Sequence, residues 1–135
     1  MVVHHSSRRT AATTFTALSA LTAMAAATPI AHGQPSPTVN SCSSGPQIRP
    51  MQLAIICDNT LRVDKITWSS WDAVRASGRG TQFLVVCEPN CATGTPIYTP
   101  VAISLDGAAA PDHRFTSATI TSLNTGEAHT YPLGG

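Results

Sequence analysis

From residue 48 onward, short apolar runs alternate with turn-forming residues at a spacing of roughly ten residues, as in a chain of short strands. The runs that predict strands are residues 51–57, 61–68, 81–87, 98–105, 113–123 and 127–131. Asp58-Asn59 and Asn124-Thr125-Gly126 stand between runs and favour turns. No stretch of this part has a convincing helical period. The pattern predicts an all-β domain, a small sandwich or barrel of five to six short strands stapled by disulfides.

Two of these runs differ in how they distribute their apolar side chains. Residues 61–68 alternate clearly, but each face carries both polar and apolar side chains. Such a strand is expected at a sheet edge or under partial cover. Residues 81–87 form an almost continuous apolar run, which predicts a central strand that is buried on both faces.

Residues 1–33 have a different pattern, typical of a secretory signal peptide. A short basic start precedes residues 13–27, an uncharged stretch rich in alanine and threonine. This stretch is shorter than the roughly 20 apolar residues that span a bilayer, so we expect it to be cleaved. Small residues just upstream predict cleavage before Gln34, and a second candidate site follows Ala27.

Beyond the cleavage site the chain has room for one domain. Residues 34–47, rich in proline and serine, predict a flexible tether, and residues 48–135 are then the β domain. Residues 34–135 hold all 7 acidic residues and six of the 8 basic ones, a formal charge of −1. No basic run could neutralise a series of phosphates, so nucleic acid is not an expected partner. We expect no membrane span after cleavage and a secreted or envelope-associated protein.

All four cysteines, Cys42, Cys57, Cys87 and Cys91, lie beyond the predicted cleavage site. An even number in an exported domain of this size predicts two disulfides. We favour Cys87 with Cys91, because a turn-forming triplet separates them, and Cys42 with Cys57. The rival pairing joins Cys57 to Cys87 or Cys91 across the core.

Other uses of these cysteines fit the sequence less well. The C-x3-C spacing lacks a second Cys or His pair, so we expect no metal and no cofactor, and the redox motif C-x-x-C is absent. A lipid on Cys42 is disfavoured, because the segment that begins at Gln34 separates this cysteine from the apolar stretch that a lipoprotein box should follow.

Both tryptophans of the chain fall within four residues, in a segment expected to connect strands 61–68 and 81–87. In the structural interpretation, Trp68 is a core ring, Trp71 caps an edge, and the glycines that flank Arg79 form a bulge. In the functional interpretation, a stacking and hydrogen-bonding patch binds a glycan, peptide or envelope polymer. That patch would consist of Trp71, Arg75, Arg79 and Tyr98. We favour the structural interpretation, because a small domain with 5% aromatic residues needs its tryptophans inside.

Three motifs in residues 68–94 form a recognisable set: W-x-x-W at 68–71, A-x-G-x-G-T at 76–81 and C-x-P-x-C-A-x-G at 87–94. Over residues 48–121, the chain resembles an uncharacterised family of small exported proteins of mycobacteria and streptomycetes. The resemblance implies export and a single β domain, and it brings no activity with it. Cys42 lies outside the shared pattern.

No group of residues predicts catalysis. Asp112 and His113 are adjacent, and neighbours on a strand project to opposite faces, so Asp112 does not orient His113; no motif places a serine beside them. We expect a non-catalytic binding module for an envelope or extracellular ligand, a glycan or a protein. The alternative is a structural accessory protein that pairs through an exposed edge at 61–68 by strand addition. A secreted hydrolase is a weaker alternative.

Overall fold

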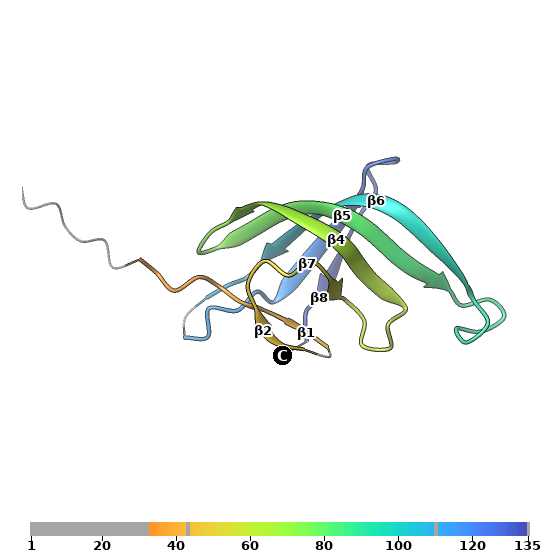
Figure 1. The fold of residues 1–135 in the computed structure, drawn as a ribbon, viewed down its shortest axis with the longest axis horizontal. Coiled ribbons are helices and arrows are strands. Elements are labelled where there is room, and N and C mark those ends of the chain that lie inside the picture. Colours follow the sequence, from red (N-terminus) through yellow and green to blue (C-terminus); the bar gives the residue numbers. More distant parts are fainter. Residues whose placement is uncertain (1–32, 43, 110, 135) are drawn as a thin grey trace, which may run out of the picture. The chain divides into compact units, whose positions relative to one another are not determined.

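The computed structural model describes residues 33–42, 44–109 and 111–134, which form the all-β domain in Figure 1. The strands are β1 (Val39–Ser41), β2 (Ser44–Gln47), β3 (Leu53–Ala54), β4 (Leu61–Trp71), β5 (Arg75–Val86), β6 (Thr95–Asp106), β7 (Ser117–Ser122) and β8 (Ala128–Pro132). Strands β3 to β8 form one antiparallel sheet in chain order, and β1 and β2 form a separate hairpin. In these three ranges there is no helix, and hence none long and apolar enough to cross a membrane. The all-β prediction is confirmed; the predicted signal peptide lies outside the described residues except for Gly33.

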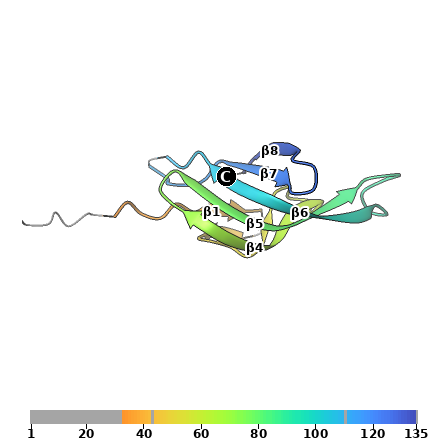
Figure 2. The same ribbon diagram turned by 90° about the horizontal axis from the view of Figure 1, so that it is seen from above.

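The six-stranded sheet curls into a half-barrel whose concave face covers the β1–β2 hairpin (Figure 1 and Figure 2). Side chains alternate between its two faces, and on the concave face they are apolar and buried. These are Leu61, Val63, Ala76, Val101, Ile103, Leu105, Ala118 and Ile120. The rest of the core consists of Val39 from the hairpin, Leu53 from β3, Ile66 from β4, and Ile55, Phe115 and Leu133 from segments between or after the strands. The core therefore lies between the concave face of the sheet and the hairpin and loops that pack against it.

Residues 34–47, predicted as a flexible tether, contain both strands of the hairpin. Val39 is completely buried in the core. The Thr38 N–H donates to the carbonyl oxygen of His113 at 2.9 Å, and the Thr38 carbonyl accepts from the N–H of Phe115 at 2.9 Å. A composition rich in proline and serine indicates only the local preference of the backbone. The structure differs from the prediction because this segment forms backbone hydrogen bonds with a part of the chain more than seventy residues away.

Both favoured disulfides are present, and the rival pairing is excluded. Cys42 is bonded to Cys57, with 5.0 Å between Cα atoms, and Cys87 is bonded to Cys91, with 4.0 Å between Cα atoms. The sulfur of Cys42 is therefore not free to carry a lipid. Two disulfides indicate that the folded domain belongs to an oxidising environment.

Contrary to prediction, both tryptophans lie within a strand, and most of the segment expected to connect the two strands belongs to the strands themselves. Strand β4 runs through Trp71, and β5 begins at Arg75. Only a tight turn separates them. In this turn the Asp72 carboxylate accepts the N–H groups of Val74 at 3.2 Å and Arg75 at 2.9 Å. These charge-dipole contacts hold the pKa of Asp72 below its usual value, chiefly through the Arg75 N–H and then the Val74 N–H.

The bulges of this region belong to β4 and not to the glycines. The register between β4 and β5 shifts between Asp64 and Thr67, and again between Trp68 and Ser70. The bulged backbone crowds the opposite strand: a Cβ on Gly80 would lie 2.7 Å from the Asp64 carbonyl oxygen. Glycine is required there because only a residue without a side chain admits this close approach.

Strands β5 and β6 extend past their neighbours at one end, as Figure 1 shows. Pairing of β4 with β5 ends at Leu84 and pairing of β7 with β6 ends at Val101, whereas β5 and β6 remain paired as far as Val86. Residues 83–98, here termed the arm, form this extension, with the second disulfide at its tip. The strand predicted at 81–87 is central in the sheet, but none of its residues is buried: β4 pairs with it only as far as Leu84, and β7 pairs with the adjacent β6 only as far as Val101.

The strand predicted at 61–68 has its outer edge covered. Strand β3 pairs with Arg62 and Val63, and the N–H of Ile66 donates to the carbonyl oxygen of Met51 at 2.9 Å. The partial cover that the mixed pattern predicted is therefore present. Strand addition at 61–68 requires a free edge, and Leu61 to Val63 and Ile66 already have backbone partners on this side.

Two other predicted strands are shorter in the structure. Of residues 51–57, only Leu53–Ala54 pair as a strand. The run 113–123 begins its strand at Ser117, because His113 has a positive φ of 46° and lies in a turn. An apolar run thus predicted the element but not its ends, which hydrogen bonding to the rest of the sheet determines.

Candidate functional site

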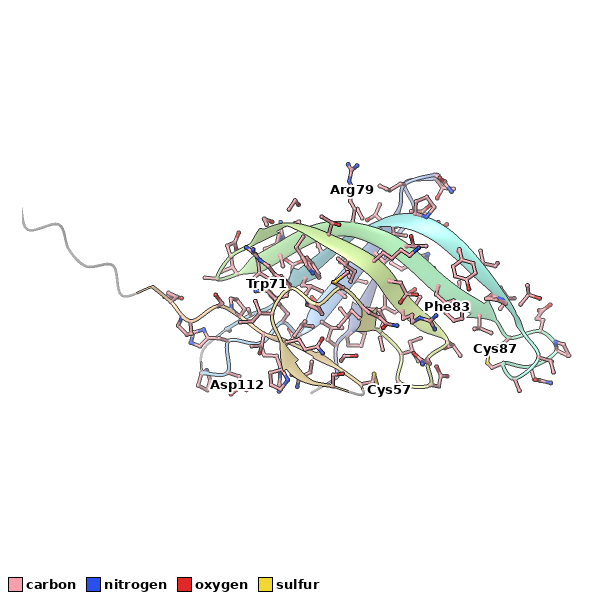
Figure 3. All side chains as sticks on the ribbon, viewed as in Figure 1. Cys57, Trp71, Arg79, Phe83, Cys87 and Asp112 are labelled. Atoms are coloured by element: carbon pink, nitrogen blue, oxygen red, sulfur yellow. A yellow bond between two sulfur atoms is a disulfide. The ribbon has the colours of Figure 1, made fainter. Side chains whose placement is uncertain are left out.

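Trp71, the first residue of the predicted binding patch, faces the core. Its ring packs edge-on against Trp68 and Phe115, with centroid separations of 4.8 Å and 5.3 Å. Its indole N–H donates to the carbonyl oxygen of Pro37 at 2.9 Å. Figure 3 shows Trp71 beneath the sheet, with Arg79 pointing away on the opposite side. These contacts fit the structural interpretation of Trp71, since the ring and its only donor are both engaged within the fold.

The other three residues lie on the outer face of β5 and β6 and do not meet. Arg75 donates from Nε to a carboxylate oxygen of Asp106 at 2.6 Å, which raises the pKa of its guanidinium. Arg79 is exposed near the middle of β5. Tyr98 is 63% exposed on the arm, with its ring 5.5 Å from that of Phe83. Arg75 and Phe83 are eight positions apart on one strand, about 26 Å. No single patch contains all four residues.

Asp112 and His113, the pair considered for catalysis, lie in a turn and not on a strand. Asp112 is exposed, and Figure 3 places it in the loop region below the sheet. Their order along the chain therefore does not project them to opposite faces of a sheet, as the sequence argument assumed. Within the described ranges, no cluster of three His, Cys, Asp or Glu side chains is arranged to hold a metal ion.

The concave face holds a groove of about 360 Å³ where the core ends, toward the arm. Its polar lining includes Gln82, Thr99, Asn124, Glu127, His129 and Tyr131. The sheet register explains why these side chains converge. His129 pairs with Ile120 and Tyr131 with Ala118, and directly opposed residues share a face. Because Ile120 and Ala118 point into the core, His129 and Tyr131 project from the same concave face.

Apart from Glu127 and His129, which contact each other, the polar groups of the groove are neutral. The Nε2 atom of His129 lies 3.0 Å from a carboxylate oxygen of Glu127, and the rings of His129 and Tyr131 are 6.5 Å apart. The turn before β8 positions this group: the Ser122 N–H donates to the Glu127 carbonyl at 2.8 Å. No Lys or Arg is among the lining residues of this groove. The remaining polar groups are amides and hydroxyls, which both donate and accept hydrogen bonds.

A larger hollow of about 610 Å³ lies beside the N-terminal hairpin and is a weaker candidate. Its lining includes Gln47, Ile48, Met51 and Asn59, and it contains no aromatic and no charged side chain. Specific sites combine an apolar surface with a few convergent polar groups. The smaller groove meets this description better, because an aromatic ring, an imidazole and several amides face one space.

The sequence analysis missed every residue of this groove. Glu127, His129 and Tyr131 stand at alternate positions just before and within β8, a spacing that could have indicated three side chains on one face. Gln82 and Thr99 gave no such signal. They face the groove because β5 and β6 pair in a register that sets them opposite each other.

Comparison with known proteins found no match to the chain among protein-family models, curated proteins or solved structures. The resemblance in residues 48–121 to small exported proteins therefore stays a prediction.

Proposed function

We propose that this protein is an exported binding module that holds a neutral glycan of the envelope or its surroundings in the concave groove. The observation that carries the proposal is the lining: Glu127 in contact with His129, the amides and hydroxyls of neutral side chains, and the ring of Tyr131 on a single concave face. The two disulfides support a location in an oxidising exterior, as does the predicted signal peptide.

A glycan fits this chemistry better than a charged ligand does. Each sugar hydroxyl both donates and accepts, and the amides of Gln82 and Asn124 offer both functions. An aromatic ring such as Tyr131 supplies an apolar surface with a polar tip, which suits the C–H faces of a sugar ring. An anionic ligand would meet Glu127 without a compensating Lys or Arg in the lining. The volume lies within the roughly 300–1,000 Å³ that small-molecule sites occupy.

The test is calorimetric titration with neutral oligosaccharides released from cell walls. Tryptophan fluorescence is a poor probe, because Trp68 and Trp71 pack against the core. Gln82→Ala and His129→Ala should each weaken binding about tenfold, the value of one well-placed hydrogen bond. Arg79→Ala, on the outer face, is the matched control and should leave affinity unchanged. Absence of binding, or equal affinity in all variants, would refute the proposal.

Of the two alternatives, strand addition at 61–68 stays a prediction, and it would have to use the part of that edge that β3 and Met51 do not occupy. The secreted-hydrolase alternative is addressed by the same samples. Oligosaccharides recovered intact after incubation with the protein would count against a hydrolase, and shortened products would favour it.

A further inference from the structure

Strand β8 forms one margin of the six-stranded sheet, as Figure 2 shows. The Ser122 N–H donates to the Glu127 carbonyl at 2.8 Å, and β7 and β8 keep one register from there on. The odd-numbered residues of β8 therefore direct their backbone groups toward β7, and Ala128 and Thr130 direct theirs away from the sheet. Within the described ranges, no strand pairs with β8 on that side, and these two residues have no backbone partner there.

Two other edges of the fold are less open to a further strand. At the opposite margin, β3 is only 2 residues long, and its Ala54 N–H donates to the hydroxyl of Ser41 at 3.4 Å. On the arm, the Leu123 N–H donates to the Pro100 carbonyl at 2.9 Å, so the even-numbered residues of β6 direct their backbone groups away from β5. Pro96 and Pro100 lack an N–H on that side. Short edge strands and prolines oppose pairing with another chain.

Strand β8 has fewer of these protections. It has 5 residues, pairs with β7 without a register shift, and contains no Lys or Arg. Its proline, Pro132, is the last residue, so the N–H groups of Ala128 and Thr130 are both retained. Both residues are exposed. An extended polypeptide presents complementary backbone groups at the same interval of two residues, so the chemistry of this edge fits an added strand.

The side chains next to this edge favour one kind of peptide. An added strand places alternate side chains on the concave face, beside Glu127, His129 and Tyr131. The contact with His129 leaves the side chain of Glu127 68% exposed, and no Lys or Arg lines this groove. Opposite charges directly across a pair of strands stabilise the pairing, whereas like charges weaken it. A basic side chain opposite Glu127 is therefore favoured over an acidic one.

We infer that β8 is the docking edge for an extended segment of another protein. This segment adds an antiparallel strand beside Ala128 and Thr130 and carries a basic side chain opposite Glu127. A second copy of β8 does not supply that charge, because Ala128–Pro132 contains neither Lys nor Arg. The inference goes beyond the glycan site, because the added strand is held by backbone groups at the sheet margin, outside the groove.

Amide hydrogen exchange tests whether the edge is open, on the exported chain with both disulfides formed. In the free protein, the amides of Ala128 and Thr130 should exchange at least about tenfold faster than those of His129 and Tyr131, which donate to β7. Equal protection of all four amides would overturn the inference, because the edge would already be covered. Protection of the first two that grows with protein concentration would overturn it as well, since the partner would then be a second copy.

The probe for docking is a capped peptide, Thr-Val-Thr-Val-Thr-Lys-Thr. Its lysine lies opposite Glu127 when its third residue pairs with Thr130 in the antiparallel direction. Titration of the protein with this peptide should protect the amides of Ala128 and Thr130 from exchange. Absence of binding overturns the inference.

N-methylated forms of the peptide test the backbone contact without changing the protein. Methyl groups on the third and fifth residues remove the donors that face β8 and should weaken binding at least about tenfold. Methyl groups on the second and fourth residues, which face away from β8, are the matched control and should change affinity by no more than about twofold. Equal affinities of the two methylated peptides would exclude strand addition at this edge.

A pair of protein variants tests the same contact from the other side. Thr130→Pro removes an N–H that does not take part in pairing with β7 and should weaken binding at least about tenfold. Thr130→Ala keeps this N–H and should leave binding unchanged. Circular dichroism verifies that both variants are folded, and the N-methylated peptides decide the question if Thr130→Pro is not. Equal losses in the two variants would contradict the inference.

The charge preference has its own test. Replacing the lysine of the peptide with glutamate should weaken binding severalfold, because the new carboxylate lies opposite Glu127. Glu127→Lys should reverse the order of the two peptides. A protein that binds both peptides equally, or a preference that Glu127→Lys does not reverse, would overturn the basic side chain as a feature of the partner.

Discussion

Strands β5 and β6 form both the arm and the opposite end of the curved sheet, around Ala76 and Leu105, here termed the closed end. The two ends differ in burial. At the closed end, Ala76 and Leu105 pair across the concave face and are both completely buried. On the same face of the arm, Leu84 pairs with Ile97, and Ile97 is 47% exposed. The larger apolar pair is thus the less buried one. Burial in this fold depends on which other segments reach the sheet and not on how apolar a strand is.

The covering segments all reach the closed end. Val39 and Phe115 enter the core there, and Trp71 hydrogen-bonds to Pro37 across a large separation in sequence. The first disulfide adds a further constraint to the N-terminal segment. The arm has its own disulfide at the tip and meets the rest of the domain at its base, where Arg62 lies over Phe83 and Leu84 packs against the core. We therefore expect the stability of the domain to reside at the closed end and the arm to be tolerant of change.

The largest difference in stability between the two ends should appear when one phenylalanine of each end is replaced with alanine. Phe115→Ala removes a completely buried ring and should lower the free energy of unfolding by about 3–5 kcal/mol. Phe83→Ala removes a half-buried ring on the arm and should cost about 1 kcal/mol or less. Urea denaturation monitored by circular dichroism measures both values. Equal costs for the two variants would contradict the division of the sheet into a stabilising end and a tolerant arm.

Removing the disulfide near the closed end should likewise cost more stability than removing the one on the arm. Cys42 and Cys57 are 15 residues apart, and replacing both with serine should cost about 3 kcal/mol through the freed loop of the unfolded chain. Cys87 and Cys91 are 4 residues apart, so the corresponding double variant should lose about 2 kcal/mol or less. Thermal unfolding of the two double variants ranks them. A larger loss from the tip disulfide would mean that the arm contributes more to folding than its contacts indicate.

The smallest effect on stability is expected from the turn between β4 and β5, and this effect depends on pH. The Arg75 and Val74 N–H groups lower the pKa of Asp72 in the folded state, so its stabilising contribution is present above the pKa of the unfolded carboxyl. It is lost as the pH falls through the folded pKa. Asp72→Ala should therefore lower stability slightly at pH 7, and the difference from the unmodified protein should vanish in acid.

The turn at the tip of the arm provides the control for this pH effect. There the neutral amide of Asn90 accepts the Thr93 N–H at 3.1 Å. Asn90→Ala should have the same small effect at every pH, because an amide does not titrate. Denaturation curves at pH 7 and pH 3 compare the variants. If Asp72→Ala lost the same stability at pH 7 and pH 3, the negative charge of the carboxylate would not be the cause of the loss.

Much of the fold could be predicted from local signals. Alternation and turn residues identified strands near 61–68, 98–105 and 127–131. The short turn between Cys87 and Cys91 predicted their disulfide, since a turn joins its flanks whatever the rest of the chain does. The residues of the candidate site could not be predicted from local signals. Its residues come from strands β5 to β8 and from the turn before β8, and they meet through the register of the sheet.

The sequence by itself determined the class of the protein: an all-β domain with two disulfides, because strand periodicity and cysteine spacing are properties of neighbouring residues. Only the tertiary structure decided which residues are buried. Val39 is buried in the core although its segment has the composition of a tether. No residue of the most apolar run, 81–87, is buried. The physical reason is that burial depends on contacts between distant segments, and a one-dimensional pattern records how apolar a residue is but not what packs against it.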